Sequence, residues 1–253
     1  FIDSIVHDGL FDPYNNFLMG KCAEKLCLEN NYSRAQQDEY AIQSYERSNK
    51  AIKNGFFNNE ICSVEVKGKK NTLTVNQDEE PLKFNKDKIL SLRPAFDKEG
   101  TITAANASTL NDGASAVILA SEAAVEKFGL TPIAKITGAA DAAQAPEWFT
   151  TAPAKALPIA LDRAGVSKED VDLWELNEAF SVVGIANNKI LGLNPEKVNV
   201  NGGAVSLGHP LGSSGSRIVV TLAHALKNRG LKVGAAGICN GGGGASAIVI
   251  EAV

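Results

Sequence analysis

A histidine and a cysteine near the C-terminal end of the chain stand in glycine-rich surroundings. His209 lies between Gly208 and Pro210 in GGAVSLGHPLGSSGSR, and Cys239 comes two residues before four consecutive glycines in GICNGGGGAS. A turn of small residues favours a histidine held in place, whereas a cysteine alone is more often a small buried hydrophobic residue. A run of glycines costs conformational entropy on folding. The presence of such a run is explained if backbone N–H groups must come close to a ligand or an oxyanion. Imidazole and thiol groups beside such donors indicate acyl chemistry with proton transfer.

Alternating strands and helices are predicted for the second half of the chain, where they would position these side chains. This alternation is typical of an α/β layered domain, which places ligands at the carboxyl ends of its strands. Asn177, His209 and Cys239 each follow or end a predicted strand, so we expect them to share one cleft. From spacing alone, however, the default interpretation of Asn177 is the N-cap of a helix. Strands are predicted over 115–121, 133–143, 171–177 and 197–203 with a strand pair over 233–253, and helices over 121–129, 152–165, 177–192 and 212–230.

The first hundred residues predict two helices, a strand and a long polar segment. One helix is predicted over 15–30, and a second over 33–55 because Ser33 and Gln36 form a capping box. Tyr45 lies on the apolar stripe of the second helix, which favours a core aromatic residue. A strand is predicted over 60–68.

The segment 71–93 is predicted to be a surface excursion, and long loops of this kind are often functional. Its lysines, Lys83 and Lys88 among them, would suit a phosphate group, although a solvated charged loop is the more common outcome.

Composition excludes several classes of protein. The chain has 25 basic and 29 acidic residues, a net charge of −4, so no basic excess indicates nucleic-acid binding. No apolar run is long enough to span a membrane. The four cysteines form no CxxC pair, which predicts neither a zinc site nor a redox motif and favours free thiols in a reducing compartment. The first residues, FIDSIVHDGLF, show no starting Met or signal pattern, so we interpret the chain as a piece of a longer protein.

Four motifs together resemble the thiolase family in order and spacing. They are TAANASTLNDGASA (103–116), NEAF (177–180), NGGAVSLGHPLGSSGSR (201–217) and CNGGGG (239–244). The chain is most similar to the biosynthetic acetoacetyl-CoA thiolases of eukaryotes within that family. The resemblance implies an α/β, layered βαβαβ fold (α-β-α-β-α) with an inserted loop domain and an incomplete N-terminal half. It implies a loop domain over residues 1–110, the end of the N-terminal half over 111–132 and the C-terminal domain over 133–253.

The resemblance also implies roles for particular residues. His209 would activate a nucleophilic cysteine and line an oxyanion hole, Asn177 would hold a water that completes that hole, and the Gly241 N–H would serve a second one. Cys239 would take the α-proton of acetyl-CoA and protonate the leaving thiolate. Coenzyme A would be substrate rather than cofactor. Residues implied around the substrate and its acyl pocket are Ser108, Lys83, Lys88, Tyr45, Leu18 and Met19, and those implied for a potassium ion in some relatives are Tyr45, Ala104, Ala105, Ala107 and Val205.

Two departures from the family pattern stand out. The family's nucleophilic cysteine lies upstream of the matched motifs, and none of Cys22, Cys27 and Cys62 fits it, so we expect a further segment of the same protein to supply it. Many biosynthetic members have His before Met-Gly near the acyl pocket, where this chain has Leu18 before Met19.

The resemblance predicts the condensation of two acetyl-CoA to acetoacetyl-CoA, in a cytoplasmic or mitochondrial homodimer or homotetramer that binds neither nucleic acid nor membrane. Two alternatives remain open: a degradative 3-ketoacyl-CoA thiolase, and a non-catalytic module that binds CoA or lipid. Activity on longer acyl-CoAs would distinguish the degradative thiolase from the biosynthetic one. The upstream sequence would distinguish the non-catalytic module from an enzyme.

Overall fold

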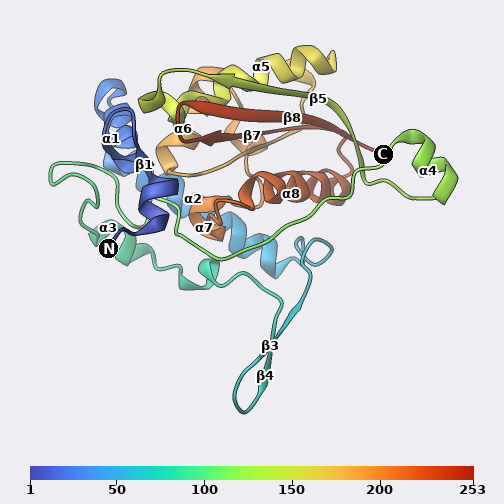
Figure 1. Ribbon diagram of the computed structural model, residues 1–253, viewed down its shortest axis with the longest axis horizontal. Helices are drawn as coiled ribbons and strands as arrows, with labels where there is room; N and C mark the ends of the chain where they lie inside the picture. Colours follow the sequence, from blue (N-terminus) through green and yellow to red (C-terminus); the bar gives the residue numbers. More distant parts are fainter.

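A mixed four-stranded sheet with helices on both faces forms the second half of the molecule, as described by a computed structural model of residues 1–253 (Figure 1). The sheet has the order β5-β8-β7-β6, with β5, β8 and β7 antiparallel and β6 parallel to β7. The strands are β1 (Phe11–Asp12), β2 (Phe17–Leu18), β3 (Val64–Lys67), β4 (Thr72–Val75), β5 (Ala134–Ala143), β6 (Leu173–Leu176), β7 (Val233–Asn240) and β8 (Gly244–Ala252).

Eight α-helices and five short helical turns complete the chain. The helices are α1 (Met19–Asn30), α2 (Arg34–Lys53), α3 (Lys86–Ser91), α4 (Glu122–Phe128), α5 (Pro153–Ala164), α6 (Ser181–Leu191), α7 (Ala204–Leu207) and α8 (Ser214–Arg229). The turns are η1 (Val6–Leu10), η2 (Glu80–Lys83), η3 (Pro146–Thr151), η4 (Lys168–Asp170) and η5 (Pro195–Lys197).

Two apolar clusters hold the sheet between α5 and α8. On one face Leu157 and Leu161 of α5 pack against Trp174 and the sheet. On the other face Ile218 and Leu222 of α8 belong to the cluster that includes Leu173. Leu173 and Glu175 alternate with Trp174 and Leu176 along β6, so β6 directs Glu175 toward α8 and is buried on both faces. The predicted α/β layered arrangement is confirmed here.

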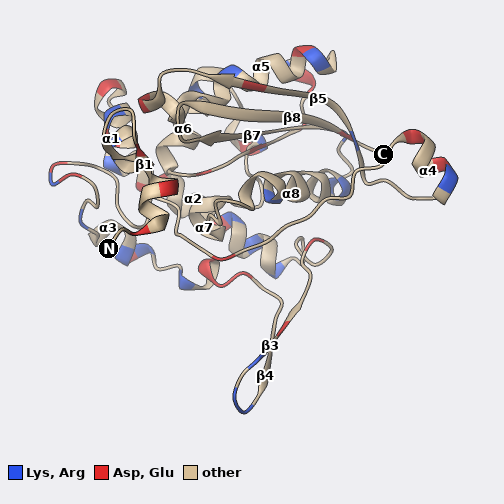
Figure 2. Ribbon diagram, in the orientation of Figure 1, with Lys and Arg blue, Asp and Glu red and all other residues tan.

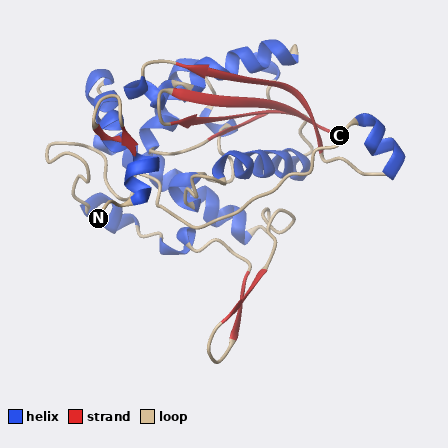
Figure 3. Ribbon diagram, viewed as in Figure 1, coloured by secondary structure: helices blue, strands red, loops and turns tan.

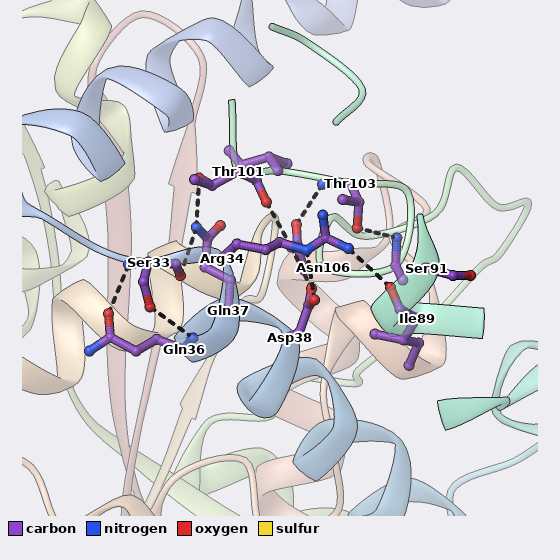
Figure 4. A network of polar contacts seen from close by, with 12 residues as sticks. Ser33, Arg34, Gln36, Gln37, Asp38, Ile89, Ser91, Thr101, Thr103 and Asn106 are labelled. Carbon is purple, nitrogen blue, oxygen red and sulfur yellow. Dashed lines mark hydrogen bonds and ion pairs between the residues drawn. The ribbon is translucent and has the colours of Figure 1, made fainter. Parts of the chain in front are cut away.

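The start of α2 is fixed by side-chain hydrogen bonds to the segment 101–106 (Figure 4). Ser33 accepts from the Gln36 N–H and the Gln36 side chain accepts from the Ser33 N–H, which confirms the predicted capping box. Asp38 is 3% exposed and accepts from Asn106 at 2.9 Å. These contacts tie α2 to the first of the four sequence motifs.

The hairpin of β3 and β4 projects from the body of the molecule (Figure 1). Figure 2 shows basic residues gathered at its tip, where the sequence has Lys67, Lys69 and Lys70. The strand predicted over 60–68 is confirmed only for 64–67, the residues of β3. The surface excursion predicted over 71–93 contains β4, η2 and α3.

Two strands predicted from sequence do not form. Residues 115–121 run as a loop that starts beside α8, where Ser115 Oγ lies 2.7 Å from Ser213 Oγ, and continues to α4 (Figure 3). A strand requires a hydrogen-bonded neighbour, and this segment has none, which leaves Ile118 95% exposed. Residues 197–203 form only isolated β-bridges. Asn199 has a φ of 47° and Gly202 a φ of 80°, and these positive values interrupt the extended backbone that a strand requires.

None of the helices is long and apolar enough to cross a membrane.

The capping box predicts a measurable contribution to stability. Ser33→Ala removes the acceptor for the Gln36 N–H and should lower the free energy of unfolding by about 1 kcal/mol, measured by denaturant titration. Ser121 caps α4 in the same way, but α4 has no buried residue, so Ser121→Ala should leave global unfolding within about 0.5 kcal/mol of the parent. Equal effects of the two substitutions would contradict the assignment of α2 to the cooperative core.

Candidate active site

His209 is held by contacts to three parts of the chain. Its backbone N–H donates to Thr109 O at 3.0 Å, Nδ1 lies 2.6 Å from Ser214 Oγ, and Nε2 lies 3.3 Å from Asn177 Nδ2. The single hydroxyl hydrogen of Ser214 is donated to the Pro210 carbonyl at 3.1 Å. Ser214 Oγ must therefore accept the His209 Nδ1–H, which leaves a lone pair on Nε2 toward Asn177.

The environment of His209 favours the neutral imidazole. The residue is 9% exposed, and burial, followed by the charge of Arg217, lowers the pKa of His209 to about 4. A neutral ring whose Nε2 carries no hydrogen can accept a proton at that atom.

Asn177 lies directly after β6 and touches the strand that carries Cys239. Its backbone N–H donates to Gly237 O at 3.0 Å, two residues before Cys239 on β7. The side chain is 1% exposed, and its Oδ1 has no hydrogen-bond partner within the protein. The interpretation of Asn177 as a helix N-cap is wrong, because α6 begins at Ser181 with Phe180 at the N-cap position. An amide oxygen free to accept fits a residue that orients a water molecule.

Cys239 lies in an apolar cluster at the end of β7. The cluster also contains Met19 and Phe180, and burial raises the pKa of the Cys239 thiol to about 12. A Cβ built on Gly241 would lie 3.9 Å from the Met19 Sδ, which places Met19 against the glycine turn. In that turn Gly243 has a φ of 86° and approaches the carbonyl of Gln144, so a side chain there would clash. The turn can present backbone N–H groups beside a neutral thiol.

The buried carboxylate of Glu178 joins the site to α2 and to the NGG turn. Its Oε1 accepts from Tyr40 at 3.1 Å and from Asn199 at 2.8 Å. Its Oε2 accepts from Ser44 at 2.8 Å and from the Val205 N–H at 3.1 Å. No role for Glu178 was predicted from the sequence, because no local pattern identifies partners this far apart in the chain.

The residues expected at the substrate divide into two groups. Ser108 donates to Ala179 O at 2.9 Å, so the segment 103–116 lies against the NEAF turn. Met19 also lies there, because it packs in one apolar cluster with Phe180. Leu18 is 38% exposed at the N-cap of α1. Lys83 and Lys88 are exposed on η2 and α3, and Lys83 forms an ion pair with Glu80.

The residues expected at potassium are only partly together. Tyr45, Ala105 and Val205 belong to one apolar cluster, and the Tyr45 ring stacks on Phe84 at 5.3 Å between centroids. Ala107 packs in the Cys239 cluster, and Ala104 is exposed. No group of three or more His, Cys, Asp or Glu side chains could hold a metal ion.

Comparison with known proteins gives consistent matches along the chain. Residues 1–123 match the family model "Thiolase, N-terminal domain", and residues 130–252 match "Thiolase, C-terminal domain". An acetyl-CoA acetyltransferase of Yarrowia lipolytica is 55% identical over 99% of this chain and 63% of its own length. A crystal structure of the Acat5 thiolase from Ascaris suum in complex with coenzyme A has a TM-score of 0.93 at 49% identity, covering 100% of this chain and 64% of that one. A human mitochondrial 3-ketoacyl-CoA thiolase has a TM-score of 0.95 at 42% identity, covering 99% of this chain and 64% of that one.

The chain spans about three fifths of the length of the curated relatives it matches. The relatives include a protein of Gibberella zeae named as cytosolic, at 51% identity over 99% of this chain and 63% of its length. Another from the same organism is named as mitochondrial, at 54% identity over 99% of this chain and 59% of its length.

The Glu178 contacts predict a strong and specific effect on stability. Glu178→Gln replaces one acceptor oxygen by an NH₂ group that faces donors, which should lower the free energy of unfolding by about 2–4 kcal/mol. Glu196→Gln is the matched control, because Glu196 pairs with Arg47 on the surface and its side chain is 77% exposed, so the cost should stay below about 1 kcal/mol. A Glu178→Gln protein as stable as the parent in denaturant titrations would show that the contacts do not hold the site.

Proposed function

The chain belongs to the thiolase family, and on that basis we propose that its natural polypeptide is an acetyl-CoA C-acetyltransferase. The reaction is the Claisen condensation of two acetyl-CoA to acetoacetyl-CoA and CoA, together with the reverse thiolysis. The observation that carries the proposal is the buried His209, held by Ser214 and Asn177, with Asn177 hydrogen-bonded to the strand that ends in the buried thiol of Cys239. The names of the curated relatives at 51–56% identity support the same activity.

In the proposed mechanism His209 and Cys239 each carry one proton between reacting groups. His209 Nε2 takes the proton of a nucleophilic cysteine, which attacks the thioester of the first acetyl-CoA. Cys239 gives its proton to the departing CoA thiolate and becomes a thiolate itself. The Cys239 thiolate then removes an α-proton from the second acetyl-CoA, and the enolate carbon attacks the acyl group. The nucleophile leaves as a thiolate and recovers its proton from His209, so protons and electrons balance.

Oxyanions form at two positions in this reaction: on the acyl carbonyl, in both the acylation and the condensation step, and on the enolate. We assign the first to His209 Nε2 with a water held by Asn177, since the Asn177 Oδ1 has no partner within the protein. We assign the second to the backbone N–H of Gly241, in the turn that follows Cys239. Donors fixed before the reaction stabilise developing charge without reorganisation.

The nucleophile is expected in a segment outside these residues. Burial, the largest cause, raises the pKa of Cys22 to about 12 and that of Cys27 to about 11, whereas an attacking cysteine needs a lowered pKa. Cys62 is exposed between α2 and β3, and no contact joins it to the site. Cys239 cannot carry the acyl group and also take the α-proton. The length of the relatives supports a longer natural polypeptide.

We assign the remaining substrate contacts by position. Ser108 would meet the pantetheine arm, and the exposed Lys83 and Lys88 would meet the nucleotide phosphates. Met19 and Leu18 would bound the acyl pocket, and Tyr45 would contact another part of the substrate. We expect a homodimer or homotetramer in the cytosol or the mitochondrion.

A degradative 3-ketoacyl-CoA thiolase is the second candidate, since the human enzyme of that name has the TM-score of 0.95. Comparing acetoacetyl-CoA with longer 3-ketoacyl-CoAs as thiolysis substrates separates the two, and preference for the longer chains would favour the degradative enzyme. A non-catalytic CoA-binding module has no need of both Cys239 and His209.

The acid–base role of Cys239 is tested in the natural polypeptide. Cys239→Ser should lower turnover by about 10²–10⁴-fold, because the hydroxyl is a far weaker acid–base group, and should leave CoA binding nearly unchanged. Exchange of the acetyl-CoA methyl protons with D₂O should fall in parallel. Cys62→Ser is the control and should retain full activity. Unchanged turnover of Cys239→Ser would remove the assigned role.

The proposed potassium site is tested by exchanging sodium for potassium in the parent and in a Tyr45 variant. Backbone carbonyls of Ala104, Ala105, Ala107 and Val205, with the Tyr45 hydroxyl, would supply an all-oxygen donor set of the kind that suits a hard monovalent cation. Replacing sodium by potassium should raise both activity and thermal stability. Tyr45→Phe keeps the stacking on Phe84 and should abolish the difference. Equal activity, CoA affinity and melting temperature of the parent in the two salts would exclude the ion.

A further inference from the structure

The backbone immediately before His209 packs against the side chain of Asn111. Gly208 has a φ of 93°, and a Cβ built on it would clash with Asn111 Oδ1. Glycine is the residue that combines this conformation with so close an approach. Asn111 therefore touches the chain at the residue that precedes the imidazole, apart from the contacts that Ser214 and Asn177 make with the ring.

Thr109 binds both of these neighbours. Its carbonyl accepts from the His209 N–H at 3.0 Å, and its hydroxyl donates to Asn111 Oδ1 at 2.7 Å. The same residue thus holds His209 through its backbone and Asn111 through its side chain. The positions of the Asn111 amide and of the His209 backbone are therefore set together.

The other end of the Asn111 amide reaches η2. Its Nδ2 donates to Glu80 Oε1 at 3.2 Å, across 31 positions in the chain. The Glu80 side chain is 12% exposed, so little water competes for this oxygen. Hydrogen bonds to a charged acceptor are stronger than neutral ones. With Oδ1 and Nδ2 both bonded, the amide of Asn111 is fixed in one orientation.

The η2 turn is itself anchored on α2. The carbonyl of the buried Pro81 accepts from Asn49 Nδ2 at 3.0 Å, and the Phe84 ring stacks on Tyr45 at 5.3 Å between centroids. Tyr45 and Asn49 are four residues apart, so both contacts lie on one face of α2. Glu80 therefore projects from a turn that is held by a long helix.

The contacts of His209 fall into two groups. Ser214 and Asn177 lie against the two ring nitrogens and limit the rotation of the imidazole. Thr109, in contrast, holds the backbone from which the ring projects. Proton transfer depends on both, because a displacement of about 1 Å at a reacting atom lowers a rate strongly.

We propose that Glu80 and Asn111 are positioning residues for His209, which fix the loop before the imidazole relative to η2. Lys83, on the exposed side of η2, pairs with the same oxygen of Glu80 that accepts from Asn111. One carboxylate thus joins the segment assigned to the nucleotide phosphates to the backbone of the assigned base. The link to catalysis rests on the function proposed above, whereas the hold on the His209 backbone does not.

Amide hydrogen–deuterium exchange of the natural polypeptide tests this hold without substrate, read at the His209 amide by mass spectrometry with electron-transfer fragmentation. Asn111→Ala should raise the exchange rate of that amide by about threefold to tenfold, the range expected for losing one hydrogen bond. Glu80→Ala should raise it in the same direction. Glu80→Gln retains an acceptor oxygen and should stay within about twofold of the parent. Glu79→Ala is the matched control, because Glu79 is the neighbouring carboxyl group and is exposed.

The double variant Glu80→Ala/Asn111→Ala separates a shared bond from two independent effects. Residues that act through their mutual bond should give a double variant that exchanges no faster than Asn111→Ala alone, whereas additive rises would overturn the proposal. An unchanged His209 amide in Asn111→Ala or Glu80→Ala, or an equal rise in Glu79→Ala, would overturn it as well. If Asn111→Ala fails to fold, Glu80→Ala removes the same bond from the η2 side and decides the question.

A kinetic comparison then tests the link to catalysis. Asn111→Ala should lower kcat for thiolysis of acetoacetyl-CoA by about tenfold and change KM by less than about threefold, because the loop before His209 is displaced. A raised KM with kcat unchanged would overturn the link to His209. A parent polypeptide without this activity would contradict the proposed function instead, and the exchange result would stand.

Discussion

The carboxylate of Glu178 is the interaction on which the geometry of the site depends. Four donors from α2, the segment after η5 and the first turn of α7 converge on its two oxygens. A buried charge is tolerated only when its lone pairs are satisfied, so all of these segments must be in place together. Gly203 is required beside it, because a Cβ there would lie 2.3 Å from the Glu178 carboxyl carbon. The neighbours of Glu178 in the chain, Asn177 and Ala179, then reach His209 and Ser108.

The proposed proton transfers depend on the burial of His209 and Cys239. Burial keeps the imidazole of His209 and the thiol of Cys239 neutral, so neither acts as a permanent charge. Each can then exchange one proton as charge develops on a substrate. The first residue of α8, Ser214, contacts Nδ1 of His209 at 2.6 Å, so this helix orients the imidazole.

Local patterns predicted the parts of the molecule that depend on local physics. The capping box of α2 and the β-α order around β6, α6, α8 and β7 formed as expected. The strand over 115–121 failed because strand formation requires a partner, which periodicity cannot supply. The role of Glu178 was missed because its donors lie between 21 and 138 residues away in the chain. The N-cap interpretation of Asn177 was wrong because spacing alone could not show that α6 begins only at Ser181.

The central claim is that these residues supply the acid–base half of a site whose acyl carrier lies elsewhere in the protein. The most direct measurement is to incubate the natural polypeptide with acetyl-CoA, quench it in acid and locate the acetyl group by peptide mass spectrometry. The account predicts one acetyl group on a cysteine outside residues 1–253, with its formation slowed strongly by His209→Gln. An acetyl group on Cys239, or on Cys22, Cys27 or Cys62, would contradict it.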